Sequence, residues 1–134
     1  PMIHTIEYRV IYGDTDAMGM VYYANYLRFY ELGRSEYMRF LGFPYAQMAA
    51  GRIECPAVSV HLNYRRSARF DDLLTIETRL KEMPRAGMTF LQRILRNGEL
   101  LNEAEVNLCF LDMVKQKPVR CPAELSEFLS KHAF

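Results

Sequence analysis

The sequence predicts an α+β fold in which an antiparallel β-sheet wraps around one long central helix. One strand pattern of alternating apolar residues comes first, a long segment of helical periodicity follows it, and four more strand patterns come next. Strands that follow one another through short links pair in antiparallel fashion. A helix that is apolar around most of its circumference is buried by more than one neighbour. We therefore expect residues 1–134 to form a single domain.

The composition is that of a protein with a packed core. Half of the 134 residues are hydrophobic and a quarter are charged, which argues against disorder. The 17 basic and 16 acidic side chains nearly cancel, so nothing indicates binding to nucleic acid or to a membrane surface. No apolar run approaches the ~18 residues of a membrane span. With no secretion signal visible and three cysteines without metal-ligand spacing, we expect free thiols and a cytoplasmic protein.

The first strand and the long helix frame a short acidic loop. Residues 4–12 alternate between two faces, as a strand does, and Gly13 ends the pattern. A loop is expected at residues 14–19, where Asp and Thr are typical turn or N-cap residues. Residues 20–41 have helical periodicity without proline, and Gly42 supplies a left-handed stop.

The rest of the chain predicts a short helical turn, four strands and a final short helix. These are expected at residues 45–51, 58–65, 74–81, 88–96, 100–110 and 123–131. Asn97-Gly98 is the strongest hairpin signal, because both residues accept positive φ. A sheet of this size has open edges, so we expect one edge to pair with a second copy of the chain.

Two carboxylates, Asp14 and Asp16, lie where the first strand gives way to the helix. A carboxylate held just ahead of a helix can attack or deprotonate, and the free amides of the helix start can stabilise developing negative charge. The alternative is that these acids only cap the helix. His61 has no second ligand at metal spacing, so no metal site is expected. The sequence contains no nucleophile elbow, P-loop or dinucleotide fingerprint.

The acidic loop and the helix resemble the signature of hotdog-fold thioesterases of the 4-hydroxybenzoyl-CoA thioesterase type. Later segments fit the same pattern, and together they are most similar to the branch of tol-pal-associated acyl-CoA thioesterases. The resemblance covers nearly the whole chain and is carried by Asp14-Thr15-Asp16-Ala17-Met18-Gly19-Met20-Val21-Tyr22-Tyr23-Ala24-Asn25-Tyr26, Phe29-Tyr30-Glu31, Arg34-Ser35-Glu36, Tyr64-Arg65-Arg66-Ser67-Ala68-Arg69-Phe70-Asp71-Asp72, Met88-Thr89-Phe90-Leu91-Gln92-Arg93-Ile94 and Leu101-Asn102-Glu103-Ala104-Glu105-Val106.

This resemblance implies a hotdog fold and an acyl-CoA thioesterase. It implies a dimer whose sheets join edge to edge, most often assembled into a homotetramer, with active sites at the subunit interface. Coenzyme A belongs to the substrate and is held partly by the partner chain, so no separate cofactor is expected. An acyl-carrier protein is a further candidate partner.

The resemblance also assigns roles in the acidic loop. It makes Asp16 the catalytic carboxylate, acting either as a nucleophile or as a general base on water, and leaves Asp14 a structural role. The backbone amide of Tyr23 becomes the donor to the thioester carbonyl, a role that does not depend on the side chain. The nearest branch often has histidine at this position, and the tyrosine here is a departure from it.

Three further residues are candidates for substrate binding, each with a structural alternative. Tyr12 could wall the acyl pocket or fill the core, and Asn25 could contact substrate or tie the helix to the loop. Arg85 could hold the phosphates of coenzyme A, as a basic residue does in the family, or be a solvated turn residue. Glu54 is a second candidate for the catalytic acid.

Two other functions are compatible with the same fold. A dehydratase or hydratase generally pairs histidine with an acid, and no histidine lies near the acidic loop. A non-catalytic adaptor that binds an acyl carrier or another protein would keep the fold without hydrolysing thioesters.

Overall fold

The computed structural model describes residues 2–132 and has the predicted α+β architecture. Its larger elements are the 17-residue helix α1 and five long strands. In chain order the elements are β1 (Ile3–Arg9), a 3-10 turn (Tyr12–Asp14), α1 (Asn25–Leu41), α2 (Tyr45–Ala50), β2 (Ile53–Glu54), β3 (Ala57–Tyr64), β4 (Leu73–Leu80), β5 (Gly87–Arg96), β6 (Glu99–Asp112), β7 (Lys117–Val119) and α3 (Ala123–His132).

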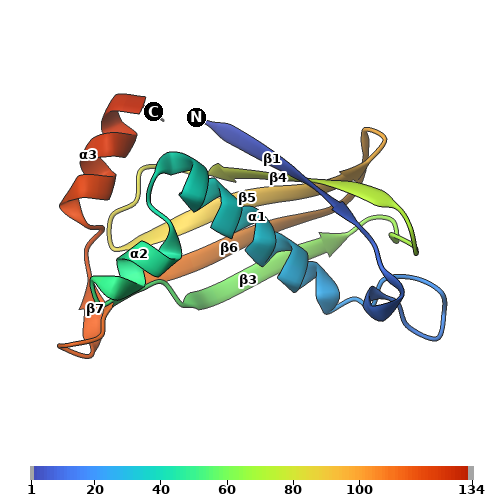
Figure 1. Ribbon diagram of the computed structural model, residues 1–134, viewed down its shortest axis with the longest axis horizontal. Coiled ribbons are helices and arrows are strands. Elements are labelled where there is room, and N and C mark those ends of the chain that lie inside the picture. Colours follow the sequence, from blue (N-terminus) through green and yellow to red (C-terminus); the bar gives the residue numbers. More distant parts are fainter. Residues whose placement is uncertain (1, 133–134) are drawn as a thin grey trace.

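The strands form one antiparallel sheet with α1 lying obliquely across one face (Figure 1). The long strands follow the order β1–β4–β5–β6–β3, and within residues 2–132 the sheet has seven strands in all. The short strands β2 and β7 both pair with the end of β6. The predicted antiparallel pairing of consecutive strands is confirmed for β4 with β5 and for β5 with β6, but it is wrong for β3 and β4, because β3 pairs with β6 and β4 with β1 and β5. On its outer side β3 has no neighbour among the described strands, so it is an open edge.

The core lies between α1 and the sheet, and α1 packs against β1, β4 and β5. Its large buried side chains include Phe29, Tyr30 and Tyr37 from the helix. Gly33 lets the helix approach the sheet closely, because a Cβ at this position would lie 2.8 Å from Ile76 Cγ2 and 2.8 Å from Thr78 Oγ1. The single glycine of the helix is therefore explained by packing.

Buried polar side chains fix α1 on the sheet. The amide nitrogen of Gln92 donates to the Tyr30 carbonyl oxygen and to Thr78 Oγ1, both at 2.9 Å. Arg34 NH1 donates to Gln92 Oε1 at 3.1 Å. Tyr30 OH donates to Asn102 Oδ1 at 2.8 Å. Directional bonds of this kind select one position of the helix, which apolar packing alone does not.

Both boundaries of the acidic loop differ from the prediction. The first strand ends at Arg9, and Tyr12 belongs to the 3-10 turn. The long helix starts at Asn25 and not at residue 20, because Met20 and Val21 are extended and form bridges with Arg69 and Thr15. The predicted helix end is confirmed, since Gly42 adopts φ 90°.

The remaining elements flank the far end of the sheet. The predicted helical turn and final helix are confirmed as α2 and α3, which lie beside one another at that end (Figure 1). The strands β2 and β7 were not predicted. No helix among the described residues has the length and apolarity needed to cross a membrane.

Candidate active site

The acidic loop forms a tight turn at Asp16, just ahead of α1 in the chain. Gly19 N donates to the Asp16 carbonyl oxygen at 3.0 Å, and Asp16 N donates to the Met20 carbonyl oxygen at 2.9 Å. Gly19 has φ 79°, a conformation that glycine adopts without strain. The turn is fastened to the segment after β3, because Val21 N donates to the Ala68 carbonyl oxygen at 2.9 Å.

The carboxylate of Asp16 does not cap α1. Its Oδ1 accepts a hydrogen bond from Met18 N at 2.9 Å, inside the turn. The N-cap residue of the helix is Ala24, which makes no side-chain capping bond. No hydrogen bond or ion pair to Asp16 Oδ2 is found within residues 2–132. The capping alternative for Asp16 is therefore wrong, and one carboxylate oxygen is available for chemistry.

Asp16 opens onto a cavity of about 230 Å³ beside the start of α1. Most of the residues that line it are apolar or aromatic, and two are arginines. Asp16 shares this cavity with Met18, Met20, Val21, Tyr23, Tyr26, Tyr64, Arg65, Arg66 and Ser67. A carboxylate at the rim of an apolar cavity is an arrangement typical of catalytic sites.

Asp14 has the structural role that was predicted for it. Its side chain is 1% exposed. Its Oδ2 accepts hydrogen bonds from Tyr8 OH at 2.7 Å and from Ile11 N at 3.0 Å, and Arg28 NH1 lies 3.7 Å from its Oδ1. Burial, followed by the bond to Asp14, raises the pKa of Tyr8 to about 12. Every oxygen of this carboxylate has a partner, so Asp14 holds the loop against β1.

Tyr23 lies in the turn just before the N-cap of α1, and it lines the cavity with Asp16. The two peptide groups of Tyr22, the second of which carries the Tyr23 N–H, are both held by hydrogen bonds. Tyr22 N donates to the Asp14 carbonyl oxygen at 2.9 Å, and Asn25 N donates to the Tyr22 carbonyl oxygen at 2.8 Å. The Tyr23 amide itself has no partner among the described backbone groups, as an oxyanion donor requires.

The other predicted site residues are dispersed. Asn25 Nδ2 donates to the Asp14 carbonyl oxygen at 2.8 Å, which is the arrangement expected if it ties the helix to the loop. Tyr12 is 74% exposed and stacks on Phe70, with ring centroids 3.7 Å apart. The alternative that Tyr12 fills the core is therefore wrong, and the residue does not line the Asp16 cavity.

Arg85 and Glu54 lie far from Asp16 within one chain. Arg85 is exposed in the link between β4 and β5, at the end of the sheet opposite the acidic loop (Figure 1). It lines a separate cavity of about 620 Å³ that includes Val58, at the start of β3. Glu54 lines a third cavity, with Arg34 and Tyr45. None of these cavities contains Asp16.

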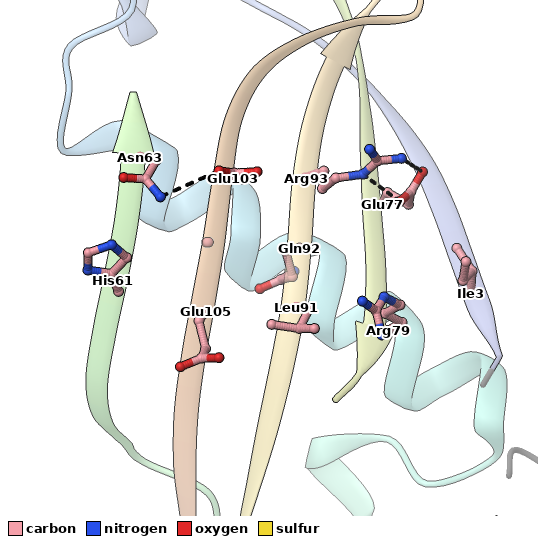
Figure 2. Close-up of a pocket in the computed structure, with 11 residues that line it drawn as sticks. Ile3, His61, Asn63, Glu77, Arg79, Leu91, Gln92, Arg93, Glu103 and Glu105 are labelled. Carbon is pink, nitrogen blue, oxygen red and sulfur yellow. Dashed lines mark hydrogen bonds and ion pairs between the residues drawn. The ribbon is translucent and has the colours of Figure 1, made fainter. Parts of the chain in front are cut away.

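A further cavity, of about 490 Å³, lies on the face of the sheet away from α1. In Figure 2 the helix α1 is seen behind the strands, and the residues that line this cavity lie in front of them. Its glutamates all have partners, either within the cavity or beside it. Arg93 Nε lies 2.9 Å from Glu77 Oε1, and Asn63 Nδ2 lies 3.4 Å from Glu103 Oε1. It contains none of the predicted site residues and offers no carboxylate beside a helix start.

Two tyrosines of the Asp16 cavity were not predicted as site residues. Tyr26 is buried, and its hydroxyl accepts a hydrogen bond from Ala68 N at 3.0 Å. Tyr64 ends β3, and its hydroxyl donates to the Tyr23 carbonyl oxygen at 2.9 Å. Both bonds join segments about 40 residues apart, so local sequence patterns reveal neither of them, and in the sequence Tyr64 is only one apolar residue of the strand predicted at residues 58–65.

Comparison with known proteins places this geometry in a family. Residues 10–129 match the Thioesterase-like superfamily. A Haemophilus influenzae (strain Rd) protein named acyl-CoA thioesterase YbgC is 39% identical over 118 residues, which are 87% of either chain.

Solved structures agree with this match. A probable thioesterase from Bartonella henselae has a TM-score of 0.85 and 35% identity, covering 90% of this chain and 100% of the other. A 4-hydroxybenzoyl-CoA thioesterase, crystallised as an Asp-to-Asn variant in complex with 4-hydroxybenzoyl-CoA, has a TM-score of 0.85 and 29% identity. It matches 94% of this chain and 97% of its own length, which confirms the hotdog fold. The chain belongs to the Thioesterase-like superfamily.

Proposed function

We propose that this protein hydrolyses acyl-CoA thioesters, with Asp16 as the catalytic carboxylate and the Tyr23 amide as the donor to the thioester oxygen. The observation that carries the proposal is the shared cavity: Asp16, with one free carboxylate oxygen, and Tyr23, just ahead of α1, line the same apolar space. The names of the relatives, which include acyl-CoA thioesterases, support this substrate class.

The reaction needs few groups. Asp16 either attacks the thioester carbonyl carbon, forming a mixed anhydride that water then opens, or removes a proton from a water that attacks directly. In both routes the C–S bond breaks, the thiol of coenzyme A leaves with a proton, and the acid is released. The carbonyl oxygen gains negative charge on the way, and an unpaired amide at a helix start stabilises it. After one turnover in ¹⁸O-water, ¹⁸O in Asp16 identifies the anhydride route, because this label arises only when water opens the anhydride at the Asp16 carbonyl carbon.

The acyl group enters the cavity, and the rest of coenzyme A extends along the open edge of β3. Val58 and Val60 on this strand are 63% and 42% exposed, which is unusual for β-branched residues on a strand and favours pairing with a second copy. Twofold pairing of two β3 strands about His61 brings Val58 of one copy opposite Tyr64 of the other, because both lie three residues from His61.

Such pairing joins two cavities that are separate in one chain. The cavity lined by Val58 and Arg85 then adjoins the cavity of the other copy that holds Asp16 and Tyr64. Arg85 of one copy is thereby free to bind the phosphates of a coenzyme A whose thioester lies at Asp16 of the other. We propose this edge-paired dimer as the catalytic unit, and its doubling to a homotetramer as the full assembly.

The three cysteines are consistent with the proposed cytoplasmic location. Cys55, Cys109 and Cys121 are free thiols. Burial raises the pKa of Cys55 to about 12 and that of Cys121 to about 11, so these thiols stay protonated and unreactive.

Release of coenzyme A from a panel of acyl-CoA esters tests the function, with Asp16→Asn as the variant. We expect its kcat to fall by roughly 10³-fold or more, with the melting temperature and the assembly unchanged. Asp112→Asn is a matched control, because Asp112 Oδ1 also accepts turn amides, from Val114 and Lys115 at 2.9 Å, but outside the cavity. A fully active Asp16→Asn variant would refute the mechanism. Binding of acyl-CoA or acyl-carrier protein by the wild type without thiol release would favour the adaptor function.

A further inference from the structure

Tyr64 lies at the junction between the open edge of the sheet and the acidic loop. It is the last residue of β3, where it stands opposite Asn102 of β6. The backbone just after it is held by β6, because Arg65 N and Arg66 N both donate to the Leu101 carbonyl oxygen, at 2.9 and 3.0 Å. The side chain of Tyr64 therefore projects from a fixed point of the sheet.

This side chain reaches across to the start of α1. Its hydroxyl donates to the Tyr23 carbonyl oxygen at 2.9 Å. Its ring meets the ring of Tyr26 edge-on with centroids 5.5 Å apart, and the ring of Tyr23 with centroids 6.4 Å apart. Tyr64 also lines the cavity that contains Asp16. A bond at this distance, supported by two aromatic contacts, restrains the residue that it joins.

The restraint falls on the peptide that follows the Tyr23 amide. The Tyr23 N–H itself belongs to the same peptide group as the Tyr22 carbonyl oxygen, which accepts from Asn25 N at 2.8 Å. The peptide after it is fixed by Tyr64 OH, the donor found for the Tyr23 carbonyl oxygen among residues 2–132. Tyr23 lies outside α1, so no full turn of helix holds it. With its own peptide group and the next one both anchored, the direction of the Tyr23 N–H is set before a substrate arrives.

We propose that Tyr64 is a positioning residue for thioester hydrolysis: its hydroxyl fixes the Tyr23 peptide so that the Tyr23 amide is preorganised to receive the charge of the thioester oxygen. This inference rests on the proposed function. An oxyanion donor contributes most when it needs no reorganisation during the reaction. Partial burial raises the pKa of Tyr64, which keeps its hydroxyl protonated as a donor through and above the neutral range.

Tyr64→Phe tests the role, because it keeps the ring contacts with Tyr23 and Tyr26 and removes only the hydroxyl. We expect kcat for acyl-CoA hydrolysis to fall roughly tenfold, less than the 10²–10³-fold cost of losing an oxyanion donor outright. KM should stay within about twofold, because the bond acts on the reacting carbonyl and not on the rest of the substrate.

Tyr37→Phe is the matched control. Tyr37 OH also donates to a backbone carbonyl oxygen, that of Met2 at 3.2 Å, but it is buried in the core away from the cavity. The control should lower the melting temperature at least as much as Tyr64→Phe while leaving kcat near the wild-type value. Equal loss of kcat in the two variants would make the effect one of general destabilisation and overturn the inference.

Asp16→Asn, measured beside them, separates the two proposals. If Asp16→Asn is inactive and Tyr64→Phe is fully active, the positioning role is refuted and the proposed function stands. If Asp16→Asn keeps wild-type activity, the proposed function fails and the role of Tyr64 fails with it. An inactive Asp16→Asn together with a selective loss of kcat in Tyr64→Phe supports both.

Discussion

The hydrogen bond between Tyr30 and Asn102, under the middle of α1, offers a quantitative test of how the helix is held. Tyr30 OH donates to Asn102 Oδ1 at 2.8 Å, and both side chains are fully buried. The amide nitrogen of Asn102 has no partner among the described residues. Tyr30→Phe keeps the ring and removes the donor, so the Asn102 side chain becomes a buried polar group with neither end satisfied.

The expected loss of stability can be worked out from the free energy that is lost when a buried polar group has no hydrogen-bond partner. Such a group costs about 1–3 kcal/mol, so we expect Tyr30→Phe to lower the free energy of unfolding by about 2 kcal/mol. Asn102→Leu leaves the Tyr30 hydroxyl unpaired and should cost a similar amount, about 1–2 kcal/mol. The double variant replaces both polar groups by apolar ones of similar shape and should be nearly neutral, with a total loss below about 1 kcal/mol.

Equilibrium unfolding in urea, followed by circular dichroism at one fixed protein concentration, measures all four proteins. A fixed concentration is needed because assembly contributes to the apparent stability. The double variant should recover most of the loss seen in the single variants, giving a coupling energy of about 2–3 kcal/mol. Strictly additive losses would refute the reasoning, because they would mean that the two groups do not depend on one another.

Three further predictions concern the substrate, the assembly and the pH dependence. Arg85→Ala should raise KM for acyl-CoA roughly tenfold, the loss of about 1.4 kcal/mol, and leave KM unchanged for an acyl-pantetheine that lacks the nucleotide; equal effects on both would contradict phosphate binding. Val60→Lys on the exposed edge of β3 should yield monomers in analytical ultracentrifugation, whereas Val114→Lys, at a turn residue that is 70% exposed, should not. Because the pKa of Tyr8 is raised from 10.0 to about 12 in the folded state, the folded protein binds more protons between these pH values and stability falls as the pH rises through that window. Tyr8→Phe should show a smaller fall of the free energy of unfolding, measured in urea, between pH 10 and 12, and an unchanged fall would contradict the raised pKa of Tyr8.

Periodicity and turn chemistry were enough to predict most of the fold. In β4 to β6 the alternation of apolar residues follows which face of the strand is buried, so it can be recognised without knowing the neighbouring strands. Asn97 and Gly98 were predicted to turn the chain, and they adopt φ 50° and 78° between β5 and β6. Gly42 ends α1 for the same reason, because the left-handed conformation costs glycine little.

The boundaries that were wrong are those set by contacts distant in sequence. Residues 20–24 have helical spacing, but Val21 N is bound to the Ala68 carbonyl oxygen, 47 residues away, and this draws the segment out of the helix. The short strands β2 and β7 exist because the long strand β6 extends past β5 and offers them a partner. The local sequence carries no information about either of these contacts, because they depend on residues far away in the chain.

The candidate site, like the fold, was predictable only in its local features. The residues alone gave two acids ahead of a helix, and the resemblance assigned different roles to them; the hydrogen bonds of Asp14 confirm its structural role. Asp16 as the catalytic residue remains a prediction, as do the roles of Tyr23 and Arg85. Tyr64 could not be predicted, because its relation to Tyr23 arises only when β3 lies beside the start of α1.

The way the acidic loop is held explains how this chain can have tyrosine at position 23, where the nearest branch often has histidine. Met20, Val21 and Tyr26 are bound to the segment after β3, and the Tyr23 carbonyl oxygen is bound to Tyr64. These bonds use the backbone of the loop or side chains other than that of Tyr23. The hydrogen bonds that position the Tyr23 amide therefore do not involve its own side chain, which is tyrosine where the nearest branch often has histidine. On this reasoning, the sheet edge, through Tyr64, and the first residue of α1, through Asn25 N, together determine the geometry of the proposed oxyanion donor, so a substitution at Tyr64 should affect catalysis more than a substitution of the Tyr23 side chain.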